Sequence, residues 1–122
     1  MDRTGKFFVT PLQRVHLNWG TTGTTDGLPR KRHPLECYIP ISSSIAKELN
    51  LYKGKCFHLA NTDFELRVSG SQGENNEYGK NLESLGNLKL LGGYLKDQLG
   101  LSPGCQVRVE WLDTNTVEIR KI

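Results

Sequence analysis

Residues 105–120 alternate between apolar and polar side chains, and this alternation constrains the fold more than any other feature of the sequence. From Cys105 to Trp111, every second residue is apolar. A period of two places these side chains on one face, which is typical of a strand with one buried face. The polar run 113–116 then turns the chain, and residues 117–120 return with the same alternation. The pattern predicts an antiparallel hairpin that packs on a core.

Four further segments predict strands. Residues 55–60 and 64–68 lie on either side of the polar turn 61–63, and we expect them to form a second antiparallel hairpin. Residues 7–9 and 38–41 are short apolar or aromatic runs. A proline lies within the last run, which indicates a strand at a sheet edge or a strand end, because proline cannot donate a ladder hydrogen bond.

A helix is predicted near residue 90. Leucines recur at helical spacing from Leu88 to Leu99, and Gly100 follows as a stop. Gly92 and Gly93 lie inside this helix, where two glycines cost about 1–2 kcal/mol in propensity. We therefore expect a neighbouring element to pack closely against the bare face that they leave.

A second short helix is predicted over residues 45–49, directly after the serines Ser42–Ser44. Serine hydroxyls cap helix N-termini, and no partner histidine is implied nearby, so we favour capping over a catalytic nucleophile. With Ser44 as the cap, Lys47 takes the position where a capping box would place Glu or Gln.

Six or so strands with two short helices are consistent with an antiparallel barrel. The 122 residues suffice for one domain and are too few for two. An apolar content of 36% with 24% charged residues excludes a wholly disordered chain. No apolar run approaches the roughly 18 residues of a membrane span, and no signal peptide is visible. Three widely spaced cysteines fit reduced thiols, so we expect a cytoplasmic protein with no membrane partner.

The sequence offers little for catalysis or metal binding. Cys56 and His58 could share a strand face, but no second ligand pair has a zinc-like spacing, and we expect Cys56 to fill the core. Cys37 lies near His33, yet nothing orients it as a nucleophile. No phosphate-loop pattern is present. We expect a binding protein with no catalytic residue, no metal and no cofactor.

Positive charge is concentrated in the N-terminal part. Residues 1–34 hold six Lys/Arg against two Asp, a sum of +4. Residues 35–122 hold ten basic and eleven acidic side chains, a sum of −1. Such an asymmetry favours a polyanionic partner, with a solvated basic loop as the alternative.

Two long polar connections, residues 18–36 and 69–87, interrupt the strands, and loops of this length tend to be functional or disordered. The first carries groups that attract phosphates and read guanine through O6 and N7. Its candidate DNA contacts are Asn18, Trp19, Thr21, Thr22, Thr24, Arg30, Lys31, Arg32 and His33. For Trp19 we favour packing at the root of the connection over a base contact.

The second connection carries amides and carboxylates. Asn and Gln suit the adenine edge, and a carboxylate accepts from cytosine N4, whereas a clamp for phosphates alone would not use acids. Its candidate DNA contacts are Ser71, Gln72, Glu74, Asn75, Asn76, Tyr78, Lys80 and Asn81. A solvated connection is the alternative. Lys53 and Lys55 are further candidates for phosphate contacts, or simply solvated lysines.

Several short motifs, in this order along the chain, resemble the C-terminal DNA-recognition domain of restriction endonucleases with a phospholipase-D-type nuclease. The motifs are Leu17–Gly20 with the basic segment after it, Tyr38–Ile41, Leu90–Leu95, Leu99–Leu101 and Val117–Ile119. The likeness spans about residues 17–122.

The resemblance implies a mainly β fold, the seven-stranded open pseudobarrel of plant B3 DNA-binding domains, with two short flanking helices, as a single domain over residues 1–122. It implies that an N-arm (about residues 18–36) and a C-arm (about residues 69–82) hold the major groove of double-stranded DNA in a sequence-specific way. The enzymes of this family carry a separate nuclease domain whose motifs this chain lacks. The resemblance therefore implies a monomeric recognition domain of a type II restriction endonuclease, and it assigns no individual base contacts.

Two other functions stay open. The segment Gly100–Gly104 before a valine-rich strand is similar to swapped-hairpin (AbrB-like) transcriptional regulators. A small barrel hydrolase would use Ser42–Ser44 or Cys37.

Overall fold

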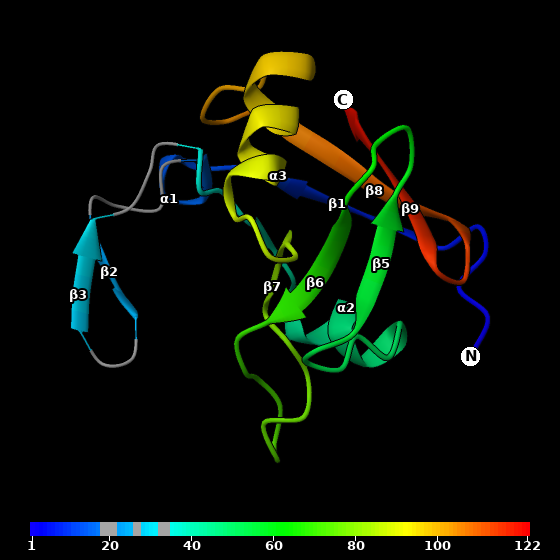
Figure 1. Cartoon of the computed structure of the whole chain (residues 1–122). Helices are drawn as coiled ribbons and strands as arrows, with labels where there is room; N and C mark the ends of the chain where they lie inside the picture. The colour runs from blue at the N-terminus through cyan, green and yellow to red at the C-terminus, as the bar shows by residue number, and fades with distance from the viewer. Residues whose placement is uncertain (18–21, 26–27, 32–34) are drawn as a thin grey trace.

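Short strands separated by tight turns and four short helical segments make up the computed structural model, which describes residues 1–17, 22–25, 28–31 and 35–122 (Figure 1). The strands are β1 (Phe7–Pro11), β2 (Thr22–Thr25), β3 (Leu28–Lys31), β4 (Ile39–Pro40), β5 (Cys56–Leu59), β6 (Glu65–Ser69), β7 (Asn81–Ser84), β8 (Gln106–Asp113) and β9 (Thr116–Lys121). The helices are α1 (Arg14–Leu17), α2 (Ser43–Glu48), α3 (Lys89–Gly93) and the π-helical turn η1 (Tyr94–Gln98), which continues α3.

Seven strands form one curled sheet in the order β1-β8-β9-β5-β6-β7-β4, while β2 and β3 pair only with each other. Neighbours in the large sheet are antiparallel except β5 and β9, which are parallel. The two predicted hairpins, β5–β6 and β8–β9, are confirmed, and so is the place of β4 at the edge of the sheet. The mainly β architecture is that of a B3-like pseudobarrel, as expected.

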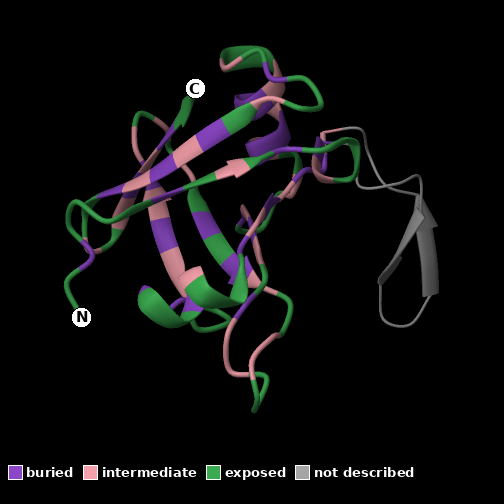
Figure 2. Ribbon diagram, turned by 180° about the vertical axis from the view of Figure 1, so that it is seen from behind, coloured by how far each residue is buried: buried purple, intermediate pink, exposed green. Residues whose placement is uncertain are grey.

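Buried and more exposed residues alternate along the strands of the curled sheet, and the buried ones form its core (Figure 2). The Trp111 side chain is 1% exposed and meets the Phe57 ring edge-on at 5.4 Å and the Phe8 ring at 6.1 Å. These residues come from β8, β5 and β1, so one aromatic cluster ties three separate parts of the chain together. Burying one such side chain contributes about 2 kcal/mol to stability.

The structure corrects four expectations about local structure. Residues 18–36 contain the β2–β3 hairpin, and residues 69–87 contain β7, so neither segment is only a connection. Strand β7 reads Asn-Leu-Glu-Ser and buries a serine, Ser84, whose hydroxyl donates to Asn87 O at 2.8 Å and accepts from Leu91 N at 3.2 Å. A buried polar residue hides the alternation on which strand prediction depends.

The other two corrections concern a cap and a cysteine. Ser42, not Ser44, is the N-cap of α2, because its hydroxyl accepts from Ile45 N at 3.3 Å. Cys56 does not fill the core: it is half-buried on the outward face of β5, while its neighbour Phe57 takes the buried position.

Arg3 does not contribute to the positive surface that the N-terminal charge was expected to form. Its guanidinium is buried, with the side chain 7% exposed, and donates to Leu49 O at 2.8 Å and to Asn50 O at 3.2 Å. Burial lowers its pKa. One of the six cations counted in the N-terminal part therefore joins the segment before β1 to the end of α2 instead of facing a partner.

The predicted close packing at the glycine pair is confirmed for Gly92 and absent at Gly93. A Cβ placed on Gly92 would lie 1.8 Å from the backbone oxygen of Leu35, which shows how closely the chain crosses α3 at this point. A Cβ on Gly93 would have its nearest neighbour, Asp97 Oδ2, at 4.0 Å. No helix in the described part of the chain is long and apolar enough to cross a membrane.

The glycine pair gives a matched test of this crossing. We expect Gly92→Ala to lower the free energy of unfolding by about 1–3 kcal/mol, because the new methyl group overlaps backbone that cannot move aside easily. Gly93→Ala should instead raise it by up to about 1 kcal/mol through better helix propensity. Urea unfolding of both variants is the measurement, and equal effects at the two positions would contradict the crossing.

Candidate nucleic-acid interface

The N-arm, residues 18–36, contains the β2–β3 hairpin, which stands outside the seven-stranded sheet (Figure 1). Its register places Thr22 opposite Lys31 and Gly23 opposite Arg30. Of the predicted contacts, Thr22 and Thr24 belong to β2, and Arg30 and Lys31 belong to β3. Asn18, Trp19, Thr21, Arg32 and His33 lie outside the described residues.

The two ends of the N-arm are joined by hydrogen bonds. Tyr38 N donates to His16 O at 3.1 Å, and the buried Cys37 thiol donates to Leu17 O at 3.1 Å. The rings of His16 and Tyr38 also meet edge-on at 5.2 Å. Burial raises the pKa of the Cys37 thiol, which therefore serves as a donor and not as a thiolate nucleophile. An arm whose ends are fixed in this way leaves the core at one defined place.

His16 is held neutral at this junction. Its Nδ1 accepts a hydrogen bond from Gln13 N at 2.8 Å, which requires that atom to carry no proton. Burial lowers the pKa of His16 below the ordinary value of 6.5. The junction at the N-arm is therefore more stable at neutral or basic pH than at acidic pH.

The C-arm, residues 69–82, is a short hairpin of its own at the lower end of Figure 1. Gln72 N donates to Tyr78 O at 2.7 Å, and Tyr78 N donates back to Gln72 O at 3.1 Å. Beyond this pair, Asn76 N donates to Gly73 O at 3.2 Å and closes the tip. Asn75 N donates to the Glu77 carboxylate at 3.0 Å. The tip is thus an ordered turn.

The tip displays amide and carboxylate groups. Glu74, Asn75 and Asn76 are exposed. Asn76 has a φ of 55°, in the left-handed region that asparagine tolerates better than most residues. No hydrogen bond within the described residues engages the side chains of these three residues, so their carboxamide and carboxylate groups are available to a ligand.

The root of the C-arm is tied to the residue that follows β4. The side-chain amide of Gln72 donates to Ile41 O at 2.9 Å and to Gly79 O at 2.8 Å, and Ile41 N donates to Lys80 O at 2.8 Å. Gly79 packs so closely on β6 that a Cβ there would lie 2.1 Å from Val68 Cγ1. Both amide protons of Gln72 are engaged, and only its oxygen remains for a ligand.

The other predicted C-arm residues surround this root. Ser71 is exposed and its hydroxyl accepts from Lys53 Nζ at 3.3 Å. Lys80 is exposed, and Asn81 is half-buried in β7 opposite Ser69 and Pro40.

Tyr78 is half-buried and stacks on Tyr52, with ring centroids 5.2 Å apart and planes 12° apart. Desolvation, followed by the neighbouring Tyr52 and Glu77, raises the pKa of the Tyr78 phenol. The phenol is therefore uncharged at neutral pH.

Cations without ion-pair partners lie near this root. Lys80 is exposed, and Arg67 points outward from β6. No ion pair among the described residues engages either of them. Ion pairs occupy the β8–β9 hairpin instead, where Glu110 meets Arg108 at 2.9 Å and Arg120 at 3.3 Å. Arg67 was not among the DNA contacts predicted from the sequence. The alternation of β6, which places Arg67 on the outward face, is the signal that could have identified it as an exposed cation.

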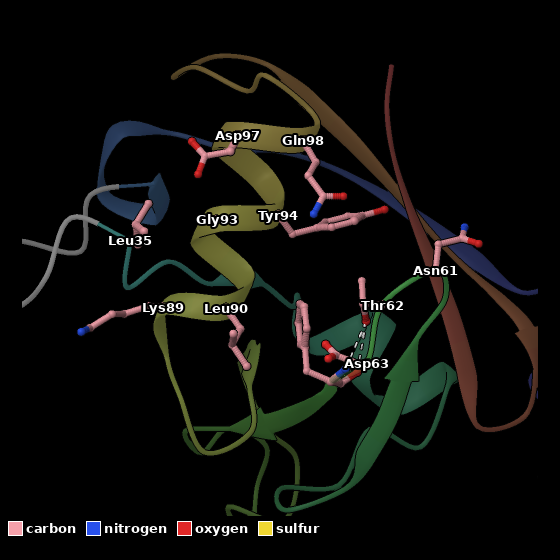
Figure 3. A pocket seen from close by; sticks show the side chains of 11 residues that line it. Leu35, Asn61, Thr62, Asp63, Lys89, Leu90, Gly93, Tyr94, Asp97 and Gln98 are labelled. Carbon is pink, nitrogen blue, oxygen red and sulfur yellow. Dashed lines mark hydrogen bonds between the residues drawn. The ribbon is translucent and has the colours of Figure 1, made fainter.

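A groove of about 720 Å³ lies between the α3–η1 helix and the β5–β6 turn (Figure 3). Its rim carries Asp63 and Asp97, which repel phosphates. The Thr62 hydroxyl donates to Leu59 O at 2.7 Å. No serine, histidine or cysteine is among the described residues that line it, and Lys89 is the one cation among them. No group of three or more metal-ligating side chains occurs within the described ranges. The described lining residues therefore offer no nucleophile with a base.

Together, a curled seven-stranded sheet and two hairpins that leave it from hydrogen-bonded roots define a DNA-binding pseudobarrel of the B3 type. A family model described as the NgoFVII C-terminal B3-like DNA-binding domain matches residues 8–121. The chain belongs to this family of B3-like DNA-binding domains of restriction endonucleases. Among curated proteins, no relative matches the chain. The family assignment makes DNA its ligand and agrees with a recognition role without catalysis.

The junction at His16 predicts a pH effect on stability. Because the folded protein lowers the pKa of His16, the unfolded chain binds more protons just below pH 6.5, and stability falls there as the pH falls. We expect the free energy of unfolding to decrease between about pH 7.5 and 5.5, above the range where carboxylates titrate. His16→Gln should flatten this decrease in urea titrations. The same slope in both proteins would contradict the assignment.

Proposed function

We propose that this protein recognises a specific sequence in double-stranded DNA through the major groove, with the N-arm and the C-arm on either side of the contact. The observation that carries the proposal is the C-arm tip, where exposed amide and carboxylate groups stand on an ordered hairpin above a root with unpaired cations. In this role the chain is the target-recognition domain of a type II restriction endonuclease whose nuclease is a separate domain. It acts as a monomer in isolation and works in the cytoplasm.

The size and chemistry of the C-arm suit the major groove. That groove is about 12 Å wide and admits a two-stranded β-ribbon, and the C-arm hairpin, which is closed by the antiparallel bridge between Gln72 and Tyr78, has a comparable form. Asn75 and Asn76 can pair with the adenine edge, and Glu74 can accept from cytosine N4. Lys80 and Arg67 lie where they can contact phosphates beside the groove, and these contacts fix the register.

The N-arm supplies the cationic half of the contact. Arg30 and Lys31 are in β3, and Arg32 and His33 follow in the sequence. Guanidinium and ammonium groups attract phosphates, and Arg also pairs with guanine through two parallel hydrogen bonds. We assign Arg30, Lys31 and Arg32 to phosphates first, because three adjacent cations follow a backbone better than they discriminate bases.

The two alternatives have less support. The segment Gly100–Gly104, which is similar to swapped-hairpin regulators, leads here into a β8 strand that pairs with β1 and β9 of the same chain. For a hydrolase, Ser42 is used as a helix cap, and the Cys37 thiol is buried and bonded to Leu17 O. Both observations favour the recognition domain.

Neutralising the N-arm should weaken binding to all duplexes alike. For the triple variant Arg30→Gln, Lys31→Gln, Arg32→Gln, we expect the slope of log affinity against log salt to become shallower by about 0.9 for each phosphate that the variant no longer neutralises. Fluorescence anisotropy over a salt series measures the slope. Lys121→Gln is the control, since it removes a charge at the end of β9, outside both arms. An unchanged slope in the triple variant would show that these three side chains do not neutralise phosphates.

Changing the C-arm tip should relax sequence preference. A target is first selected from a randomised duplex pool, and binding is then compared with single-mismatch duplexes. We expect Asn75→Ala to lose about 1–3 kcal/mol of discrimination at one base pair while nonspecific affinity stays the same. Glu74→Ala should lose discrimination too, but its nonspecific affinity should rise, because the variant removes a negative charge. A uniform decrease in affinity for every duplex would instead make the tip a backbone contact.

A further inference from the structure

Tyr52 lies outside both arms, in the segment between α2 and β5, yet it contacts the C-arm. Its ring stacks on Tyr78 with centroids 5.2 Å apart, and the two residues form an isolated antiparallel bridge. The Tyr52 side chain is 47% exposed and does not belong to the buried core. The Tyr52–Tyr78 stack therefore lies outside the core and joins this segment to the C-arm.

The residue after Tyr52 continues the same contact. Lys53 N donates to Glu77 O at 3.1 Å, and Lys53 Nζ donates to Ser71 Oγ at 3.3 Å. These bonds hold both strands of the C-arm hairpin, one through Ser71 and the other through Glu77. The segment 52–53 therefore braces the hairpin at a second place, in addition to the Gln72 amide, which ties it to the end of β4.

The position of the tip depends on this brace. Residues 73–77 extend beyond the Gln72–Tyr78 pair, so a tilt of the hairpin at Tyr78 moves the whole tip. Hydrogen bonds to base edges weaken steeply when donor and acceptor move apart or out of line. Phosphate contacts by mobile lysines tolerate such a shift, because they depend on charge more than on direction.

We infer that Tyr52 is a positioning residue for sequence discrimination: by stacking on Tyr78, it fixes the direction in which the C-arm tip meets the base edges. This inference rests on the proposed function. Tyr52 acts through Asn75 and its neighbours at the tip, and makes no base contact of its own.

The test compares Tyr52→Ala with the conservative variant Tyr52→Phe, which keeps the stacking ring. We expect Tyr52→Ala to reduce the ratio of affinities for the selected target and a single-mismatch duplex by up to about tenfold, the upper end of what an aromatic pair contributes. Tyr52→Phe should keep the wild-type ratio of affinities for the target and the mismatch duplex. The salt slope should stay the same in both variants, since Tyr52 neutralises no phosphate.

A double variant separates positioning from direct contact. If Tyr52 acts through the tip, adding Tyr52→Ala to Asn75→Ala should cause almost no further decrease in discrimination at the base pair that Asn75 reads. Additive decreases would overturn the inference and make Tyr52 a DNA contact in its own right. Unchanged discrimination in Tyr52→Ala would also overturn it.

Two controls keep the outcome decisive. Thermal unfolding establishes that each variant is folded at the assay temperature, and Tyr52→Leu, which keeps apolar contact without a stacking ring, replaces Tyr52→Ala if that variant is not. The wild-type protein separates the two claims. A wild type without sequence preference contradicts the proposed function, whereas a wild type that discriminates no better than Tyr52→Ala contradicts only the role of Tyr52.

Discussion

The candidate DNA interface depends on backbone hydrogen bonds at the roots of the two arms. At the N-arm, Tyr38 N reaches His16 O at 3.1 Å, and at the C-arm, Ile41 N reaches Lys80 O at 2.8 Å. Polar segments of this length would otherwise carry a large conformational entropy, which binding to DNA would have to overcome. Because their ends are fixed, each arm is presented to a ligand from a defined place. The hydrophobic core includes Leu17, Cys37 and Ile41, which lie at these junctions.

Unpaired cations and exposed amide and carboxylate groups occupy different parts of the candidate interface. Ion pairs neutralise cations on the β8–β9 hairpin, whereas Lys80 and Arg67, near the C-arm, have no such partner among the residues that the structure describes. The C-arm tip carries amides and a carboxylate, which add little to the attraction for phosphates. Affinity and discrimination can therefore be altered separately, because one depends on net charge and the other on hydrogen-bond geometry.

Sequence reasoning succeeded where alternation was strict and failed where polar residues were buried. The β5–β6 and β8–β9 hairpins follow directly from period-two patterns. Strand β7 was missed because Ser84 takes a core position, and Arg3 was counted as a surface charge because nothing in its neighbours signals burial. For the candidate site, composition predicted DNA contacts in residues 69–82 but could not show that the Gln72 amide is used at the root of this arm or that Tyr52 stacks on Tyr78. Both contacts join segments far apart in sequence, which no local pattern reveals.

The central claim is that the C-arm tip enters the major groove. The most direct test introduces Asn75→Cys in a protein whose half-buried thiols are removed by Cys56→Ser and Cys105→Ser, and offers it the selected duplex with a thiol tether. We expect a disulfide cross-link when the tether is attached to a base edge in the major groove, and none when it is attached in the minor groove. Cross-linking from the minor groove alone, or from neither groove, would contradict the account.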